Sequence, residues 1–386
     1  MASPKNIIIL GGYGRAGHEI AKLLLKVSPH NICLAGRDRI KACRASNELN
    51  FRHFGQRVTG IEVNTALHKQ FTRVLADYDL VIVAMPVTGI GGSIARAAMD
   101  AKIDYIDLNA DSEKRQVLRE LDGEIREAGL TFITEAGFVP GAPSMMARYV
   151  AGHFDSLDEV TIGGLFKEER ISYGSMVDVI TTLGDSPGIF TDGSWSKAGM
   201  TVMKKIDFGK GLGIRSCFPM DLAELHGLPE ELGCQQLGFY GSGVNRFFDS
   251  MVLLWKALGL YKTSRGIDLG ARVLVWGNEK FTRQPYICSV NTVASGFSGG
   301  REKQVKLTVE HKDSYAATAI AIIPGIMGLL DGSISQSGVH IMGHVLDPDR
   351  YLENLWDMGM TVSLQGLCEI ELELEVSSAR EMRLAV

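Results

Sequence analysis

Three glycines near the N-terminus have the spacing of a phosphate-binding turn. Gly12, Gly14 and Gly17 form a G-x-G-x-x-G triplet between an apolar run and a helical pattern. The first glycine of such a triplet permits a tight turn, the second admits a pyrophosphate to backbone N–H groups, and the third lets the helix pack on the strand. The spacing alone is a weak signal, but its strand and helix context predicts a dinucleotide site. Its residues are Gly12, Tyr13, Gly14, Arg15, Ala16 and Gly17.

The stretch LAGRDR (residues 34–39) predicts which dinucleotide binds. A carboxylate about 20 residues past the glycines accepts the ribose hydroxyls of NAD, whereas an arginine suits the 2′-phosphate of NADP. Arg37 occupies this place, and a guanidinium makes paired, charge-assisted hydrogen bonds to phosphate. The sequence therefore favours NADP. Asp38 keeps NAD open as an alternative, and a solvated arginine at the start of a helix is the structural alternative for Arg37.

The elements that position these residues alternate through the first 150 residues. Short apolar runs without polar alternation are typical of parallel strands that are covered on both faces. We predict a doubly wound parallel sheet, a Rossmann domain of the α/β class, over residues 1–150. The expected strands are 7–10, 31–36, 57–63, 79–85, 104–108 and 130–134, and the expected helices are 15–27, 38–50, 66–75, 90–101 and 112–128.

Ligands of such sheets bind beyond the carboxyl ends of the strands. The loops after the fourth, fifth and sixth strands are therefore expected to line the nicotinamide end of the dinucleotide. The expected cofactor residues in these loops are Met85, Pro86, Thr88, Asn109, Gly137 and Phe138.

The second half has a different pattern, in which segments of alternating apolar and polar residues, typical of strands, are separated by glycine-rich turns. Residues 151–314 are expected to form an α+β domain with a large, mostly antiparallel sheet that serves substrate binding and dimerisation. Its expected strands are 157–166, 201–209, 271–279, 286–293 and 303–311, with a helix over 246–260. The sequence leaves open whether residues 315–386 return to complete the first domain.

Composition limits the classes of function. The 386 residues carry a net charge of −5, which argues against binding nucleic acid through the overall field. Six cysteines without a CxxC pair indicate neither a disulfide framework nor a structural zinc, and a cytoplasmic location is expected. The N-terminus has no apolar segment typical of a secretory signal. The uncharged run over 314–330 is shorter than the roughly 20 residues of a membrane span, so we expect a buried helix and no membrane partner.

The sequence resembles the saccharopine dehydrogenase family, in its branch of saccharopine reductase and lysine-dehydrogenase-like enzymes. The resemblance covers the first 150 residues best, and the middle of the chain matches only in general texture. It implies an NAD(P)-dependent oxidoreductase, expected to be a homodimer, that acts on a C–N bond of a small amine, amino acid or imine. The segments that carry the resemblance are GGYGRAG, LAGRD, YDLVIVAMP, YIDLNAD, AGFVPG and the later YAATAIAIIPGIMGLLDG.

Such chemistry needs an acid with a tuned pKa, since hydride addition to an imine requires a proton at nitrogen. Asp111 and Glu135 follow the fifth and sixth strands and are the catalytic candidates. A helix N-cap explains Asp111 equally well, and hydrogen bonds within a turn explain Glu135 equally well.

Four further residues are expected to form the substrate site: Pro140, Gly141, Tyr173 and Thr318. The first two belong to the G-x-x-P-G turn that the resemblance places between cofactor and substrate. Ordinary packing is the alternative for Tyr173 and Thr318. His340 and His344 are four residues apart, but nothing nearby completes a ligand set, so no metal site is expected. A matching set of arginines for substrate carboxylates is missing from 170–300, which makes saccharopine itself a doubtful substrate.

Two other hypotheses remain open from the sequence. One is a non-catalytic dinucleotide-binding sensor or scaffold that has lost the acid. The other is a dehydrogenase of a simple amino acid or a semialdehyde.

Overall fold

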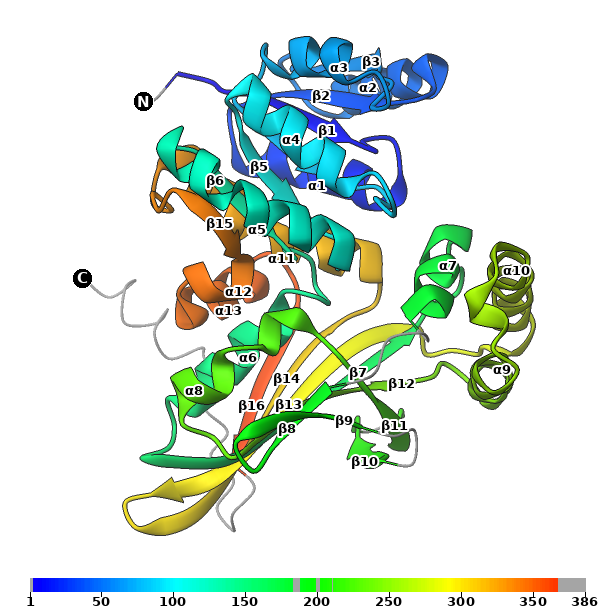
Figure 1. Ribbon diagram of the computed structural model, residues 1–386, viewed down its shortest axis with the longest axis vertical. Helices are drawn as coiled ribbons and strands as arrows, with labels where there is room; N and C mark the ends of the chain where they lie inside the picture. Colours follow the sequence, from blue (N-terminus) through cyan, green and yellow to red (C-terminus); the bar gives the residue numbers. More distant parts are fainter. Residues whose placement is uncertain (1–2, 183–187, 199–201, 210, 367–386) are drawn as a thin grey trace. The chain divides into compact units, whose positions relative to one another are not determined.

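A computed structural model describes residues 3–182, 188–198, 202–209 and 211–366, and the chain divides into two compact units (Figure 1). The first unit takes Met1–Met145, Leu222–Glu224 and Asp313–Gly359. The second takes Met146–Asp221, Leu225–Lys312 and the residues from Met360 onward. No pattern in the sequence predicted that Leu222–Glu224 would join the first unit.

The first unit contains a seven-stranded sheet in the order β15-β6-β5-β4-β1-β2-β3, with every neighbouring pair parallel. The expected doubly wound fold is thereby confirmed, and β15 adds one strand at the edge beside β6. The strands are β1 (Asn6–Leu10), β2 (Asn31–Gly36), β3 (Val58–Glu62), β4 (Leu80–Val83), β5 (Asp104–Asp107), β6 (Thr131–Thr134) and β15 (Gly338–Ile341).

Alternating residues of the strands divide the core of this unit into two layers. Tyr105 packs with α4 and α5 in one apolar cluster, whereas its neighbour Ile106 lies against Gly325 of α11. Helix α1 packs on α11, so both faces of the sheet are covered. The helices are α1 (Arg15–Val27), α2 (Arg39–Arg52), α3 (His68–Leu75), α4 (Gly91–Ala101), α5 (Ser112–Glu127), α6 (Ala142–Ala151), which begins here and continues into the second unit, α11 (Ser314–Asp331), α12 (Met342–Val345) and α13 (Pro348–Asp357).

Helix α11 is long and apolar enough to cross a membrane by length and composition, and 61% of its apolar window is buried. Asp313 caps its start by accepting from the N–H groups of Tyr315 and Ala316. Ala317, Ala319, Ile320 and Ile322 are all buried. The burial is that of a core helix, as the sequence predicted for this segment.

The second unit contains a nine-stranded sheet whose main path runs β10-β11-β12-β7-β13-β14-β16, with β8 and β9 attached beside β12. All its pairs are antiparallel except β12 with β7, so the expected mostly antiparallel sheet is confirmed. The strands are β7 (Ser156–Lys167), β8 (Gly188–Thr191), β9 (Ser194–Lys197), β10 (Lys204–Asp207), β11 (Ile214–Met220), β12 (Gln236–Ser242), β13 (Ile287–Ser298), β14 (Arg301–His311) and β16 (Thr361–Gly366).

One expectation for the second half is wrong, and one question that the sequence left open concerns the C-terminal segment. Residues 271–279 are not a strand: they belong to α10 (Ser264–Phe281), which Thr263 caps by accepting from the Gly266 N–H. The C-terminal return ends earlier than residue 386, because β16 pairs with β14 in the nine-stranded sheet. Residues 367–386 lie outside the described part of the chain. The remaining helices are α7 (Tyr173–Thr182), α8 (Leu228–Leu232) and α9 (Arg246–Ala257), with single 3₁₀ turns η1 (Ala223–Leu225) and η2 (Leu260–Lys262).

Candidate dinucleotide and active site

The glycine turn lies between β1 and α1 and leaves no room for side chains at two of its three glycines. A Cβ on Gly17 would lie 2.4 Å from the Gly11 carbonyl oxygen, and one on Gly12 would lie 2.9 Å from the Ile9 carbonyl oxygen. A Cβ on Gly14 would lie 3.0 Å from the same Gly11 oxygen. The first and third glycines therefore do what the spacing predicts, since they bring the start of α1 against β1.

The start of α1 is an open set of backbone donors. Gly14 is its N-cap and has no side chain to accept from the first N–H groups, and the first turn, wholly within the described chain, carries no acidic residue. Unsatisfied N–H groups and the helix dipole together favour an anion at this position. A cavity of about 330 Å³ adjoins it, lined by Tyr13, Gly14, Arg15, His18, Glu19, Asp313 and Tyr315. The geometry fits a phosphate group.

Arg15 links this turn to the start of α11. Its guanidinium lies 3.9 Å from the centre of the Tyr315 ring and 3.8 Å from Asp313 Oδ2. The stacking holds a positive charge beside the cavity while the side chain stays about half exposed.

Arg37 and Asp38 follow the carboxyl end of β2 and have different surroundings. Asp38 is the N-cap of α2, where its Oδ1 accepts from the Lys41 N–H at 3.0 Å, and this bond keeps the pKa of Asp38 below its ordinary value. Arg37 is exposed. The Tyr13 ring lies across Gly36, where a Cβ would come within 2.5 Å of it, and its hydroxyl accepts from the Asp38 N–H at 3.1 Å. The carboxylate that would favour NAD is thus engaged in capping.

The loop after β4 adjoins the glycine turn. A Cβ on Gly11 would lie 2.8 Å from both the Ala84 carbonyl oxygen and Met85 Cβ. Pro86 and Thr88 of the same loop are exposed. The structure therefore brings Met85 beside the glycine turn, as a cofactor-lining role requires.

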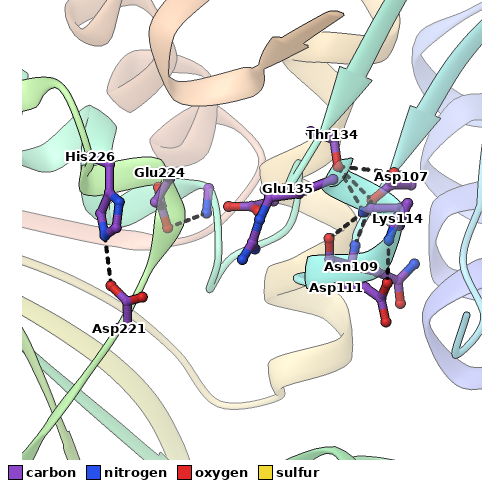
Figure 2. Close-up of polar contacts among 11 residues, drawn as sticks. Asp107, Asn109, Asp111, Lys114, Thr134, Glu135, Asp221, Glu224 and His226 are labelled. Carbon is purple, nitrogen blue, oxygen red and sulfur yellow. Dashed lines mark hydrogen bonds and ion pairs between the residues drawn. The ribbon is translucent and has the colours of Figure 1, made fainter. Parts of the chain in front are cut away.

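A fully buried ion pair fixes the ends of β5 and β6 (Figure 2). Lys114 Nζ of α5 donates to Asp107 Oδ1 at 2.6 Å, to the Asn109 carbonyl oxygen at 2.5 Å and to Thr134 Oγ1 at 2.8 Å. Tyr105 donates its hydroxyl proton to the other Asp107 oxygen. Every strong hydrogen-bonding group of the pair is engaged, which offsets the cost of burying two charges. Sequence reasoning missed Lys114, because lysine on a helix is normally a surface residue.

Asp111 and Asn109 lie in the loop that this ion pair holds. Asp111 is the N-cap of α5, and its Oδ1 accepts from the Lys114 N–H at 2.7 Å. The structure therefore shows Asp111 in the alternative role that the sequence left open, that of a helix N-cap. The Asn109 N–H donates to Asp107, while its buried Nδ2 has no hydrogen-bond partner within the described residues.

Glu135 is buried beneath the turn that follows β6. Its backbone has a φ of +56°, a left-handed conformation that is uncommon outside glycine, and its Oε1 accepts from Arg115 Nη1 at 2.8 Å. Its other oxygen is buried and unpartnered among the residues that the structure describes. Glu135 thus keeps one unpartnered acceptor, fully buried, in the loop expected at the nicotinamide end.

The turn at 137–141 is closed on itself. A Cβ on Gly141, whose φ is +131°, would lie 2.2 Å from the Gly137 carbonyl oxygen. Thr318 of α11 approaches Gly137, with its methyl carbon 3.7 Å from the position of a Cβ there. Pro140 is buried, and Phe138 is only 1% exposed. Phe138 is thus a core side chain in this structure.

Glu224 is an acid that sequence reasoning did not identify. It lies fully buried on η1, on the same side of the view as Asp221 and His226 (Figure 2). It accepts from the N–H groups of Gly141 at 2.8 Å and Ser144 at 3.0 Å, and from the Ser144 hydroxyl at 2.5 Å. Burial raises the pKa of Glu224 to about 7, and the charge of Glu135 adds to this rise. Its stretch, DLAELH, matches no motif, so only the fold shows its place.

His340, His344 and Tyr173 each bond to a different partner and do not form one site. The His344 ring nitrogen bonds to the Glu224 carbonyl oxygen at 2.7 Å, and His340 bonds to that of Gln336. The described residues contain no group of three side chains that would hold a metal ion. Tyr173, in the second unit, is exposed and donates to Asp268. The five cysteines in the described ranges form no disulfide with one another.

Comparisons with known proteins agree with this geometry. Residues 7–133 match the family model described as the saccharopine dehydrogenase NADP binding domain. Two curated relatives are carboxynorspermidine synthases: that of Vibrio alginolyticus is 25% identical over 326 residues, covering 75% of this chain and 78% of its own. That of Vibrio cholerae is 24% identical over 321 residues, covering 73% and 76%.

The fold also matches that of a solved enzyme. Apo saccharopine dehydrogenase (L-Glu forming) from Saccharomyces cerevisiae superposes with a TM-score of 0.71 and 17% identity, covering 94% of this chain and all of that one. The resemblance inferred from the sequence is confirmed for the NADP-binding domain, since residues 7–133 match the saccharopine dehydrogenase model and the chain is similar to the two synthases over most of its length.

Proposed function

We propose that this protein is an NADP-dependent oxidoreductase that transfers a hydride at a C–N bond of a small amine, amino acid or imine. The observation that carries the proposal is the pairing of an open glycine turn at α1 with a β2 end at which Asp38 is engaged in capping and Arg37 is exposed. A 2′-phosphate would find an exposed guanidinium there, whereas a ribose hydroxyl would have to share a carboxylate that already caps α2.

Different residues are proposed to bind the different parts of the cofactor. The N–H groups at the start of α1 bind the pyrophosphate, and Arg37 binds the 2′-phosphate. Met85 and the loops after β5 and β6 face the nicotinamide end. The bound nicotinamide supplies or receives the hydride.

The residues of the chain supply the proton chemistry. Glu135 is the stronger candidate for handling the proton at the substrate nitrogen, because one of its carboxylate oxygens is unpartnered within the described chain. Asp111 is the weaker one, because its carboxylate caps α5.

The assignment to a C–N bond comes from the family. Carboxynorspermidine synthases and a saccharopine dehydrogenase are among the relatives, and the family resemblance implies substrates in which an amine joins a carbonyl-derived carbon. A simple amino acid or a semialdehyde is the alternative substrate class.

One observation favours a second function, a non-catalytic NADP sensor. Both expected acids already have partners, since Asp111 caps a helix and Glu135 pairs with Arg115. A protein that only binds the cofactor needs neither acid free.

A single experiment separates the two functions. The purified protein is titrated with NADPH and then assayed for oxidation of NADPH, or reduction of NADP, with lysine, saccharopine and imines formed from polyamines. Tight binding with turnover of one substrate supports the enzyme. Tight binding without turnover across the panel favours the sensor, and absence of binding contradicts both.

A further inference from the structure

We propose that Glu224 is a positioning residue, which holds the turn at 137–141 in the conformation that the nicotinamide end of the bound cofactor requires. The inference rests on the proposed function, because it assigns that turn to the nicotinamide end. It adds a residue that lies outside the glycine turn, the strand ends and every motif found in the sequence.

Glu224 fastens the turn through three donors. Its two carboxylate oxygens receive the Gly141 N–H, the Ser144 N–H and the Ser144 hydroxyl, and the same hydroxyl lies 3.1 Å from the Gly141 carbonyl oxygen. Gly141 also folds back on Gly137, since a Cβ on Gly141 would lie 2.2 Å from the Gly137 carbonyl oxygen. Loss of the carboxylate therefore frees the end of the turn where its backbone folds back on itself.

Glu224 is itself held in place. The His344 ring nitrogen bonds to its carbonyl oxygen, and Gly343 lies so close to Ser144 that a Cβ there would overlap the Ser144 hydroxyl. The carboxylate is fully buried, so water does not replace its bonds. Because Glu224 is buried and held in place, we expect removal of its carboxylate to change the conformation of the turn and not only the surroundings of residue 224.

The electrostatic surroundings make this anchor sensitive to pH. The titratable groups that face it are Glu135 of the turn with its partner Arg115, His344 of α12 and Tyr351 of α13. Glu135 repels the ionised form of Glu224, and burial does so more strongly, which raises the pKa of Glu224 to about 7. Only the ionised carboxylate accepts all three bonds without turning a proton toward a donor, so the turn is firmly held above about pH 7.

The test follows the emission of bound NADPH, which reports the surroundings of the nicotinamide without needing a substrate. Wild type, Glu224→Gln and Glu231→Gln are titrated with NADPH and with 2′-phospho-AMP, which has only the adenosine end, between pH 5.5 and 8.5. Glu231 is the matched control, because it lies seven residues along on α8 and pairs with Arg148 at a half-exposed position.

We expect the emission of NADPH bound to wild type and to Glu231→Gln to change with a midpoint near pH 7. In Glu224→Gln we expect no such change, together with affinity for 2′-phospho-AMP within about twofold of wild type. Ser144→Ala, which removes one of the three donors, is expected to shift the emission in the same direction by less. Ser144→Ala replaces Glu224→Gln in this test if circular dichroism shows that Glu224→Gln does not fold.

The outcomes distinguish the inference from the proposed function. If wild type binds NADPH and Glu224→Gln has the same emission and pH profile, the positioning role is wrong while the cofactor assignment stands. If Glu224→Gln loses 2′-phospho-AMP as well, the residue supports the whole unit, and the specific role is again wrong. If wild type binds neither ligand, the proposed function fails together with the inference.

Discussion

Arg37 is the residue at which cofactor choice is decided in this account. It is exposed beyond β2, and its neighbour Asp38 is committed to the cap of α2. Arg37→Asp is expected to weaken NADPH binding about 10- to 100-fold, because a charge-assisted contact is replaced by repulsion, and to weaken NADH binding far less. Fluorescence titration with both nucleotides measures this. The control is Arg44→Asp, at an exposed position of α2. An equal loss of NADPH affinity in both variants would show a general charge effect.

Lys114 tests the buried ion pair at the strand ends. Lys114→Met is expected to lower the free energy of unfolding by about 3–5 kcal/mol, since it leaves the Asp107 carboxylate buried without its partner. Urea denaturation gives the value. In the double variant Lys114→Met with Asp107→Asn the loss is expected to be smaller than in the single one. A larger loss in the double variant contradicts the explanation by an uncompensated charge.

The residues of the site differ in how far sequence could identify them. Gly12, Gly14 and Gly17 are close together in the chain, and their spacing carries the mechanism with it. Glu224 and Lys114 gain their roles from partners brought by folding: Glu224 bonds to Gly141 across 83 residues of sequence. A buried charge leaves no local pattern, because its environment comes from other elements.

At the scale of the element, the packing of α1 on β1 depends on the absence of a side chain. Gly17→Ala places a Cβ about where it meets the Gly11 carbonyl oxygen, at 2.4 Å, and backbone cannot move aside as a side chain can. We expect lower thermal stability and loss of NADPH binding. Gly123→Ala, inside α5 where a Cβ meets nothing within 4 Å, is the matched substitution and should instead stabilise the protein by about 0.5–1 kcal/mol. Scanning calorimetry compares the two, and similar effects would contradict the close-packing argument.

The strands and helices of the first 150 residues were predictable, whereas one segment of the second unit was assigned to the wrong type of element. Buried parallel strands leave uninterrupted apolar runs, and caps such as Asp38 and Asp111 mark where helices begin. The segment ARVLVWGNE within α10 was wrongly predicted as a strand because Val273, Leu274, Val275 and Trp276 form a short apolar run, which periodicity alone does not distinguish from a buried strand. The preceding cap at Thr263 was the signal that favoured a helix.

At the scale of the whole molecule, the raised pKa of Glu224 links stability to pH. A folded-state pKa of about 7, above the ordinary value of 4.5, means that the folded protein binds this proton more readily than the unfolded chain. The stabilisation is complete below about pH 4.5 and is lost as pH rises through about 7. Between pH 5 and pH 8, the free energy of unfolding of wild type should fall relative to Glu224→Gln by up to about 3 kcal/mol. Urea denaturation across this range measures the difference, and parallel curves for the two proteins would be evidence against it.

The central claim is that the first unit binds NADP through its glycine turn and Arg37. The most direct measurement is equilibrium titration of the unmodified protein with NADPH and with NADH at the same ionic strength. We expect saturable binding of NADPH that is at least about tenfold tighter than that of NADH, the ratio given by one charge-assisted phosphate contact. Equal affinity, a preference for NADH or no binding of either nucleotide would contradict it.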